Sequence, residues 1–462
     1  MIDIDAFHLP GLELGGHRDW DTLEYDGVRL RVPILTPDAV RRLADGLRQA
    51  RDRELARRPV ADIVAAIDHA AASLTEGALR RQVDDALPAV ARYSPPMARL
   101  VMERMSADWR APALDGLLKA ELGDPAVLDR FVADAAGRRV HATGPALAFH
   151  VFAGNVPGVA ITAAVRSLLV RAATLAKTAS DEPLLPALFA RALAAADPGL
   201  GRCIAVTYWP GGRDDLNAAA AGAADAVVVY GGEEAVRTLR GMTAPDQRFV
   251  AHGPRVSFGL VGREADHTTA ARVARATAVF DQHGCVSPHV VYVEDEGRVS
   301  PEGFAEEVAQ RLEAIEAELP RGPGTPAEAA AIHQVRGGAE FRELAGAGVK
   351  LFAAARTRST VIFDPDPAFA LSCLNRTLWI KRVGDLQEVA GHVEPFRRFL
   401  QSAAIAGAGA RTQDLGIQLA RVGVARITDF DRLPWPPASW HHDGRGPLRE
   451  LLRWTDLEGQ AG

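Results

Sequence analysis

Cysteine is scarce in this chain and charge of one sign is not in large excess, and each scarcity excludes a class of protein. The 462 residues contain three cysteines, Cys203, Cys285 and Cys373, which lie far apart and form no CxxC pair. They predict neither a disulfide framework nor a cysteine-ligated metal site, so a reducing cytoplasm is the simplest compartment. A formal net charge of -6 gives no electrostatic reason to expect nucleic acid as a partner.

Long hydrophobic runs are also missing. No stretch approaches the ~20 apolar residues that a membrane-spanning helix needs; residues 159–176 come closest, but Arg166 and Arg171 interrupt them. The first residues, Met1-Ile2-Asp3-Ile4-Asp5, are acidic and do not have the basic-then-apolar pattern of a signal segment. With 48% hydrophobic and 24% charged residues, the composition predicts a soluble globular enzyme of two or three domains.

The N-terminal part is predicted to be a hairpin followed by helices. Asp26-Gly27 lies between two strand-like segments, 22–25 and 28–32, which is a hairpin signal. Thr36-Pro37-Asp38 then opens a helix with an N-cap residue and a proline in its first turn. From there to about residue 136 the chain is Ala/Arg-rich and has no metal-ligand or catalytic-triad spacing, so its charges are interpreted as solvated helix faces.

A strand–helix–strand unit follows. Residues 146–152 have the pattern of a buried strand, and a Gly/Asn/Pro turn leads into an apolar helix and then a strand at 174–177. This order predicts a parallel sheet with a right-handed crossover, in which ligands collect at the carboxyl ends of strands. Asn155 and Lys177 fall at two such ends, and Lys177 with Ser180 could hold an anionic or hydroxylated ligand. The alternatives are an ordinary turn asparagine and a surface lysine.

A second unit repeats the pattern. Strands are predicted at 203–209 and 225–230, and Gly231-Gly232 separates the second strand from a helix at 233–240. A diglycine there would let a pyrophosphate approach the backbone N–H groups at the positive end of the helix, although a tight turn explains it equally well. The G-x-G-x-x-G dinucleotide fingerprint is absent. Cys203, in the middle of a strand, is interpreted as core packing.

Cys285 is the residue around which we place the chemistry. It lies on a turn between a predicted helix at 268–280 and a predicted strand at 289–294. Gly284 removes a side chain beside the sulfur, and Pro288 fixes the backbone just beyond. A cysteine on such a turn can present a thiolate nucleophile together with its own N–H as an oxyanion donor. The alternative is a buried structural cysteine, because free cysteine behaves as a small hydrophobic residue.

The C-terminal half reads as a second α/β layer. Residues 249–261 predict strand, turn and strand at a domain crossing; further predictions are a helix at 302–319, strands at 359–364 and 376–383, and a mainly helical segment at 386–406. His441-His442-Asp443 could suggest a metal site. With no third ligand in register, a structural or cleft-lining role is favoured, and no metal is predicted.

Taken together, these features resemble the aldehyde dehydrogenase superfamily, and within it the LuxC-type acyl-CoA reductases, the fatty-acid reductase subunits of bacterial bioluminescence operons. The motifs that carry the resemblance are residues 154–158, residues 281–288 around Cys285, and the ending from Gly423 through His442-Asp443-Gly444 to Glu458. The resemblance implies that Cys285 is the nucleophile and that Asn155 supplies an oxyanion-hole side chain. It also implies that Lys177 and Ser180 hold the adenosine ribose and that Gly231 and Gly232 flank the pyrophosphate.

The fold implied by the resemblance is an α/β fold of the aldehyde dehydrogenase type, with two Rossmann-like parallel-sheet domains, a helical N-terminal region and a small oligomerisation element. The expected divisions are an N-terminal hairpin and helical region at 1–136 contributing to the cofactor domain and a nucleotide-binding domain at 137–248. A catalytic domain at 249–415 and a C-terminal segment at 416–462, returning to the cleft or oligomerisation region, complete the chain.

Two departures from the superfamily bear on the reaction. Hydrolytic aldehyde dehydrogenases carry a glutamate base where this chain has residues 250–255, a stretch without a carboxylate. Water is then poorly activated, which favours exchange with a thiol carrier over hydrolysis. Ser180 replaces the glutamate that grips the ribose in NAD-preferring relatives, which favours NADPH while leaving NADH possible. The superfamily's glutamate for the nicotinamide ribose has no obvious equivalent near 372–376.

These features predict an acylating aldehyde dehydrogenase type of acyl-CoA reductase, which reduces an acyl thioester to the aldehyde with NADPH. The expected partners are acyl-CoA or an acylated carrier or synthetase protein, and, by resemblance, a second copy of the chain in a homo-oligomer. Two alternatives stay open: an aldehyde dehydrogenase that forms acid or acyl-CoA, and a catalytically idle partner within an acyl-transfer complex.

Overall fold

The computed structural model describes residues 1–12 and 20–458. Residues 13–19 of the expected N-terminal region and 459–462 of the expected C-terminal segment lie outside the described residues. The chain forms two compact units. The first comprises Met1–Ala91, Arg99–Gly253 and Pro437–Gly462, and the second comprises Arg92–Ala98 and Pro254–Pro436. The C-terminal segment expected at 416–462 is divided between the two units after residue 436. The expected boundary at residue 248 falls within a strand of the first unit.

The N-terminal elements follow the local signals of the sequence. Strands β2 (Trp20–Tyr25) and β3 (Val28–Pro33) are antiparallel around Asp26-Gly27, with Gly27 at φ 72°, and β1 (Ile2–Asp5) pairs with β3. The Thr36 side chain caps the first helix by accepting from the Ala39 N–H. The helices of this region are α1 (Pro37–Ala50), α2 (Val60–Thr75), α3 (Arg80–Ala91), α4 (Pro95–Ala107) and α5 (Ala111–Leu122).

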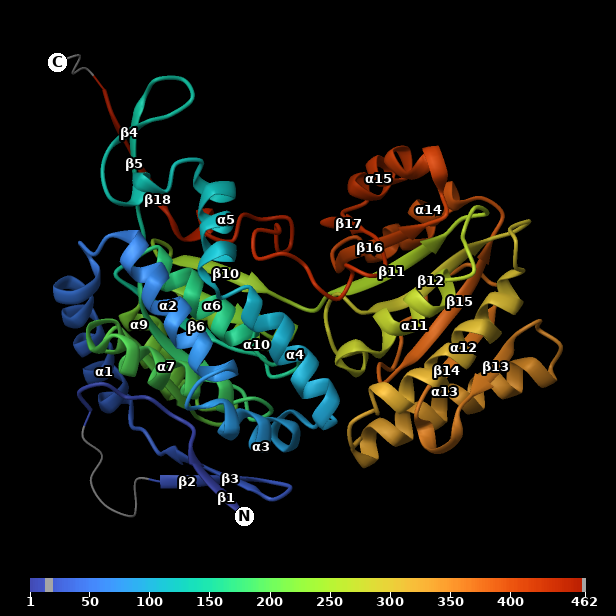
Figure 1. Ribbon diagram of the computed structural model, residues 1–462, viewed down its shortest axis with the longest axis horizontal. Coiled ribbons are helices and arrows are strands. Elements are labelled where there is room, and N and C mark those ends of the chain that lie inside the picture. The colour runs from blue at the N-terminus through green and yellow to red at the C-terminus, as the bar shows by residue number, and fades with distance from the viewer. Residues whose placement is uncertain (13–19, 459–462) are drawn as a thin grey trace. The chain divides into compact units, whose positions relative to one another are not determined.

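A five-stranded parallel sheet organises the first unit (Figure 1), with the strand order β10-β9-β6-β7-β8. Its strands are β6 (Leu147–Val151), β7 (Ala173–Thr178), β8 (Ile204–Tyr208), β9 (Ala226–Tyr230) and β10 (Arg248–His252). The connecting helices are α6 (Val159–Leu169), α7 (Leu184–Ala196), α8 (Pro198–Gly201), α9 (Asp214–Ala223) and α10 (Glu233–Gly241). Leu43 and Leu47 of α1 and Leu216 of α9 share a core cluster with the sheet. The predicted strand–helix–strand units are confirmed.

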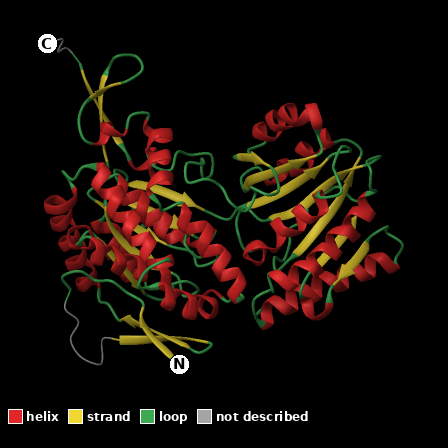
Figure 2. Cartoon of the chain, in the orientation of Figure 1, coloured by secondary structure: helices red, strands yellow, loops and turns green. Residues whose placement is uncertain are grey.

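A seven-stranded sheet organises the second unit, with the order β13-β14-β15-β12-β11-β16-β17 and an antiparallel edge strand, β13 (Lys350–Ala353). The other strands are β11 (Val256–Val261), β12 (Pro288–Glu294), β14 (Thr360–Asp364), β15 (Thr377–Val383), β16 (Leu400–Ala406) and β17 (Arg426–Thr428). Helices α11 (Thr269–Ala278), α12 (Pro301–Glu318), α13 (Pro326–Leu344), α14 (Val389–Val393) and α15 (Thr412–Arg421) flank it (Figure 2).

One predicted element is wrong. The segment 386–406 was expected to be mainly helical. Only α14 and short 3-10 turns in it are helical, and the segment ends in strand β16, which lies between β11 and β17 in the sheet. The strand sequence LQSAAIA is rich in helix-favouring alanine, and it is buried through Ile405. A parallel strand covered on both faces carries no polar alternation, so the sequence gives no strand period.

A small sheet completes the first unit. The C-terminal strand β18 (Arg453–Leu457) runs antiparallel to β5 (Arg139–Thr143), whose other neighbour is β4 (Val132–Ala133). The side chains of β18 are exposed.

Candidate active site

Cys285 lies on the predicted turn between a helix and a strand. Helix α11 ends at Ala278, a single turn at Val279–Gln282 follows, and β12 begins at Pro288. The Cys285 side chain is partly exposed, unlike that of Cys203, which is fully buried. A Cβ on Gly284 would lie 3.0 Å from the Phe280 ring and 3.2 Å from the Ser287 hydroxyl. Glycine therefore fits the tightly packed turn beside the sulfur.

The backbone before Cys285 is strained. Phe280, Asp281 and Gln282 all have left-handed conformations, with φ of 59°, 49° and 69°. A second run of three follows at Leu374, Asn375 and Arg376, with φ of 63°, 57° and 59°. Non-glycine residues with positive φ cost of order 1 kcal/mol or more each and persist only where surrounding contacts impose them. Such strain concentrates at functional sites, which supports a role for this turn.

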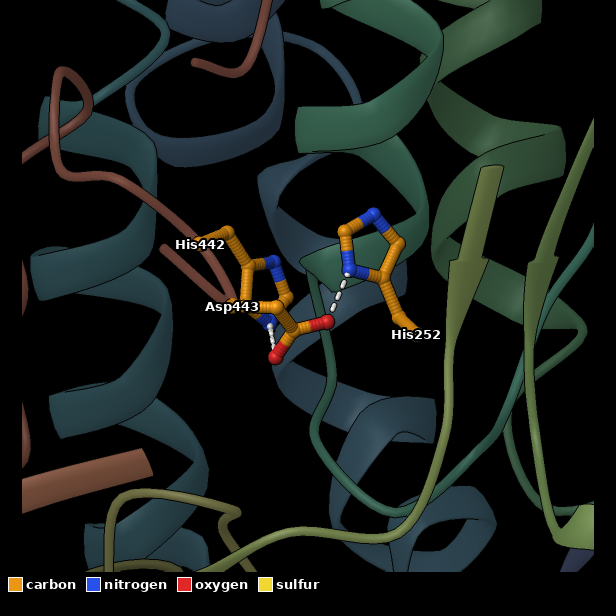
Figure 3. Close-up of side chains that lie close together, drawn as sticks. All are labelled: His252, His442 and Asp443. Atoms are coloured by element: carbon orange, nitrogen blue, oxygen red, sulfur yellow. Dashed lines mark hydrogen bonds and ion pairs between the residues drawn. The ribbon is translucent and has the colours of Figure 1, made fainter. Parts of the chain in front are cut away.

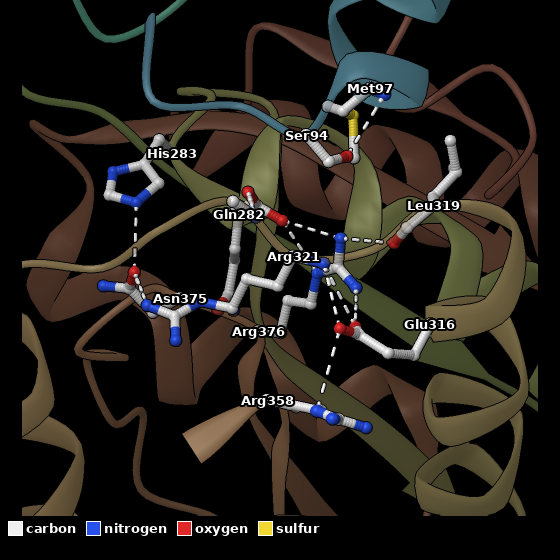
Figure 4. A network of polar contacts seen from close by, with 12 residues as sticks. Ser94, Met97, Gln282, His283, Glu316, Leu319, Arg321, Arg358, Asn375 and Arg376 are labelled. Atoms are coloured by element: carbon white, nitrogen blue, oxygen red, sulfur yellow. Dashed lines mark hydrogen bonds and ion pairs between the residues drawn. The ribbon is translucent and has the colours of Figure 1, made fainter. Parts of the chain in front are cut away.

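A buried polar network imposes the two runs on each other (Figure 4). The Gln282 amide donates to the carbonyls of Pro288 and Thr377, each at 2.8 Å, and its oxygen accepts from the Thr377 N–H at 2.7 Å. Arg376, whose side chain is fully buried, donates through Nε to Asp281 at 2.9 Å and through Nη1 to Glu316 at 3.0 Å. Asp281 also accepts from the Gly322 N–H at 3.0 Å. The network fixes the turn that carries the thiol.

Strands β11 and β17 contribute two further polar side chains to this region. Ser257 of β11 donates from its hydroxyl to the Cys285 carbonyl at 2.8 Å, and that hydroxyl oxygen accepts from the Ser402 N–H at 3.1 Å. Burial lowers the pKa of the Arg426 guanidinium, on β17, to about 10, and the charges of Asp429 and of an ionised Cys285 oppose that shift. Arg426 belongs to the C-terminal motif that carries the family resemblance, and its sequence context predicts no role for it.

The other predicted site residues belong to the first unit, at the carboxyl edge of the five-stranded sheet. Val151 of β6 is paired with Lys177 of β7, and Tyr230 of β9 with His252 of β10, so these four strands end at the same edge. Asn155 is exposed on the loop between β6 and α6. Two glycines shape that loop, because a Cβ on Gly154 would lie 2.7 Å from Asp181, and Gly158 has φ +92° with Trp109 at 3.0 Å.

Lys177 and Ser180 follow β7 at this edge. The Lys177 ammonium lies 6.0 Å from the centre of the Tyr208 ring, and burial lowers its pKa. Ser180 is exposed, and its carbonyl accepts from the Tyr25 hydroxyl of the N-terminal hairpin. The Asp181 carboxylate lies 3.5 Å from the Ser180 hydroxyl. A partly desolvated cation and a hydroxyl therefore lie close in sequence at the end of one strand, with a carboxylate beside them.

Gly231 and Gly232 lie between β9 and α10, as predicted. Neither has positive φ, and a Cβ on Gly232, the N-cap residue of α10, would meet open space. The turn itself therefore does not require glycine at 232, and the N–H groups of the helix can be approached there. Glu233 and Glu234 occupy the first turn of α10 and offset part of its positive potential.

The structure adds a feature that the sequence analysis missed (Figure 3). His252, the last residue of β10, lies 2.7 Å through Nδ1 from the Asp443 carboxylate, and His442 lies beside both. Residues 250–255 carry no carboxylate. The carboxylate of Asp443, which lies 191 positions later in the chain, nevertheless contacts His252. His252 is therefore a third ionisable side chain beside His442 and Asp443, whereas the sequence offered no third residue in register with them. No local pattern signals this contact.

Comparison with known proteins identifies the family. A family model described as acyl-CoA reductase (LuxC) matches residues 55–454. The chain belongs to the acyl-CoA reductase family. The predicted family and enzyme class are confirmed.

Relatives of this chain include the long-chain acyl-protein thioester reductase of Aliivibrio fischeri, which is 27% identical over 371 residues, covering 77% of this chain and 74% of that protein. The protein of the same name from Vibrio harveyi is 24% identical over 377 residues, covering 79% and 75%.

Solved structures establish that this chain has the aldehyde dehydrogenase fold. The NADP-dependent glyceraldehyde-3-phosphate dehydrogenase from Bacillus halodurans has a TM-score of 0.77 at 17% identity and covers 99% of both chains. The NAD-dependent benzaldehyde dehydrogenase from Corynebacterium glutamicum has a TM-score of 0.76 at 17% identity and covers 98% of both. Among the helices of the described residues, none is both long enough and apolar enough to span a membrane.

Proposed function

We propose that this protein reduces a long-chain acyl thioester to the aldehyde through an acyl-enzyme on Cys285, with NADPH as reductant. The family match over residues 55–454 carries the proposal, together with relatives named long-chain acyl-protein thioester reductase. The strained, network-fixed turn at Cys285 supports it, since such strain accompanies function. The thioester would be carried by CoA or by an acylated carrier or synthetase protein.

The proposed chemistry uses two residues of the chain. The Cys285 thiolate attacks the thioester carbonyl carbon, the bond from that carbon to the carrier sulfur breaks, and the carrier leaves as a thiolate, which takes a proton from solvent. The Asn155 side-chain amide and the Cys285 N–H donate hydrogen bonds to the oxyanion that forms. When bound, the nicotinamide supplies the hydride that converts the acyl group into the aldehyde. The Cys285 thiolate is then the leaving group, and it returns to its starting state.

The cofactor proposal rests on the carboxyl edge of the five-stranded sheet. Lys177 offers a partly buried ammonium and Ser180 a hydroxyl, which suit a phosphorylated ribose, and Gly232 leaves the first N–H groups of α10 open to a pyrophosphate. Asp181 beside Ser180 would instead suit an unmodified ribose, since a carboxylate accepts from hydroxyl groups and repels a phosphate. NADPH is proposed, and NADH is the alternative that the same residues allow.

The decisive experiment uses the three cysteines. Wild-type protein is incubated with long-chain acyl-CoA without NADPH, and the acylated peptide is identified by mass spectrometry. Acylation is expected on Cys285 and absent in Cys285→Ala, which also forms no aldehyde when NADPH is added. Cys203→Ala is the matched control, because burial raises the pKa of the Cys203 thiol to about 12 and keeps it protonated. Thioester-dependent aldehyde formation by Cys285→Ala would contradict the proposal.

A homo-oligomer in a cytoplasmic setting completes the proposal. Size-exclusion chromatography with light scattering measures the molar mass directly, and a mass of one chain, 49.3 kDa, would contradict the oligomer.

A further inference from the structure

The loop before β14 adds a third strained segment to the edge of the sheet that carries the Cys285 turn. Strands β14, β15 and β12 are neighbours in the seven-stranded sheet and run parallel, so the segments that precede them meet at one edge. Residues 280–282 precede β12, and residues 374–376 precede β15. Arg356 and Thr357 precede β14 and also have left-handed conformations, with φ of 53° and 59°. Strained backbone is therefore concentrated along this edge, as is typical of active sites and ligand-binding loops.

Two arginines hold the 355–358 loop in this conformation. Positive φ at a β-branched residue such as Thr357 is an outlier that persists only under contacts from elsewhere in the fold. Arg321 donates through Nη1 to the Thr357 carbonyl at 3.1 Å. Arg336 of α13 donates through Nη2 to the carbonyls on either side of the loop, at 3.1 Å and 2.8 Å. The loop is thus fixed by its carbonyl groups, and its own side chains are left to face outward.

The outward side chains of this loop carry unbalanced positive charge. Arg356 is exposed and forms no ion pair with a described residue. Arg358 is 52% exposed, and the nearest carboxylate, that of Glu316, lies 4.0 Å from its Nε. Glu316 already accepts from Arg376 at 3.0 Å and from the backbone N–H of Arg321 at 3.1 Å. One shared carboxylate therefore faces several guanidinium groups, and the loop offers two of them to a negatively charged ligand.

Arg321 also keeps one donor unused. Its Nη1 and Nη2 are bound by Thr357 and by the side-chain oxygen of Asn375, but its buried Nε has no hydrogen-bond partner among the described residues. A Cβ on Gly324 would lie 2.8 Å from Nη2, so glycine leaves room for the guanidinium there. Buried polar atoms are almost always paired, so the unpaired N–H indicates a site for a further acceptor oxygen.

This group of arginines adjoins the turn that carries the thiol. The Asn375 oxygen that accepts from Arg321 lies 3.4 Å from Nε2 of His283, which is two positions before Cys285. Figure 4 shows these three polar side chains together with Arg358. Guanidinium groups bind phosphate oxygens through paired N–H donors. A thioester carried by CoA or by 4′-phosphopantetheine brings phosphate groups to the nucleophile, so the charge of the 355–358 loop matches that of the carrier.

We propose that Arg356 and Arg358 bind a phosphate group of the thioester carrier, an inference that rests on the proposed reductase function. Arg321 is a positioning residue, because it holds the loop through the Thr357 carbonyl. No bond forms or breaks at this site: the guanidinium groups hold the carrier while its thioester reaches Cys285. The site belongs to the second unit, whereas the residues proposed for NADPH belong to the first.

The test compares three thioesters that have the same long acyl chain and different carriers: CoA, 4′-phosphopantetheine and pantetheine, which has no phosphate. The double variant Arg356→Ala, Arg358→Ala is expected to raise the KM for acyl-CoA about tenfold, the effect of losing one charge-assisted hydrogen bond. The KM for acyl-pantetheine and the KM for NADPH should stay at their wild-type values. Acyl-phosphopantetheine should follow acyl-CoA if the 4′-phosphate is bound, and acyl-pantetheine if the nucleotide phosphates of CoA are bound.

Arg311→Ala is the matched control, because Arg311 is 51% exposed in the same unit and pairs with Glu307 at 3.6 Å. The proposal is overturned if the double variant raises the KM for acyl-CoA no more than Arg311→Ala does. It is also overturned if the KM for acyl-pantetheine rises equally, since the loop would then act by shaping the thiol turn. Both results leave the proposed function standing. A wild type that forms aldehyde from none of the three thioesters overturns the proposed function, and this inference with it.

Discussion

The buried ion pair between Asp281 and Arg376 gives a sharp test of how the turn that carries Cys285 is held. Asp281→Asn removes the charge that faces the fully buried Arg376 guanidinium but keeps the shape of the side chain. Asparagine also tolerates the left-handed backbone at φ 49°, so the substitution adds little backbone strain. Alanine at this position would mix the loss of charge with that strain.

The magnitude follows from the contacts. Asp281 makes charge-assisted bonds to Arg376 at 2.9 Å and 2.7 Å and accepts from the Gly322 N–H at 3.0 Å. A hydrogen bond to a charged group contributes about 1.5–3 kcal/mol, and removing one partner of a buried pair costs about 3–5 kcal/mol. Arg376 keeps its hydrogen bonds to Glu316 and to the Leu319 carbonyl in this variant. We therefore expect Asp281→Asn to lower the free energy of unfolding by about 2–4 kcal/mol.

The assay is urea unfolding, combined with hydrogen exchange of peptides that cover residues 279–289. Asp295→Asn is the control: its partner Arg382 is 56% exposed, and such a surface pair contributes about 0.2–1 kcal/mol. Asp281→Asn should also expose the 279–289 amides to faster exchange and slow the acylation of Cys285. The reasoning is refuted if Asp281→Asn lowers the free energy of unfolding no more than Asp295→Asn and leaves the exchange of the 279–289 amides unchanged. The Asp281–Arg376 pair then does not hold the turn.

Three further predictions concern the first unit. Burial raises the pKa of Glu182 from 4.5 to about 8, so the folded chain keeps a proton that the unfolded chain releases. Wild type should lose stability as pH rises towards 8, and Glu182→Gln should not, as thermal melts at pH 6 and 9 will show. Gly158 has φ +92°, and a Cβ there would lie 3.0 Å from Trp109, so Gly158→Ala should lower the free energy of unfolding by at least about 1 kcal/mol. Gly232→Ala, where a Cβ meets open space, should keep the melting temperature but raise the KM for NADPH. Ser180→Glu should shift preference from NADPH to NADH, and an unchanged ratio of kcat/KM values for the two cofactors would contradict the proposed ribose site.

The sequence by itself determined the elements whose signals are local. The hairpin at Asp26-Gly27, the capped start of α1 and the helix–turn–strand around Cys285 were all predicted and are observed. Turn chemistry, capping and hydrophobic period act over a few residues, so they can be read without knowledge of the fold. The positions of Asn155, Lys177 and Gly232 at strand ends followed from the same local order together with the rule for parallel sheets.

Tertiary structure decided what depends on distant partners. Arg376 reaches Asp281 across 95 positions, and Asp443 reaches His252 across 191, so no local pattern could reveal either pair. The left-handed turns at 280–282 and 374–376 exist because each braces the other through Gln282 and Arg376. Strand β16 was missed for a related reason: burial on both faces between β11 and β17 overrides the helical preference of its alanines. Pairing and burial are properties of the assembled sheets, and these set the surroundings of the thiol.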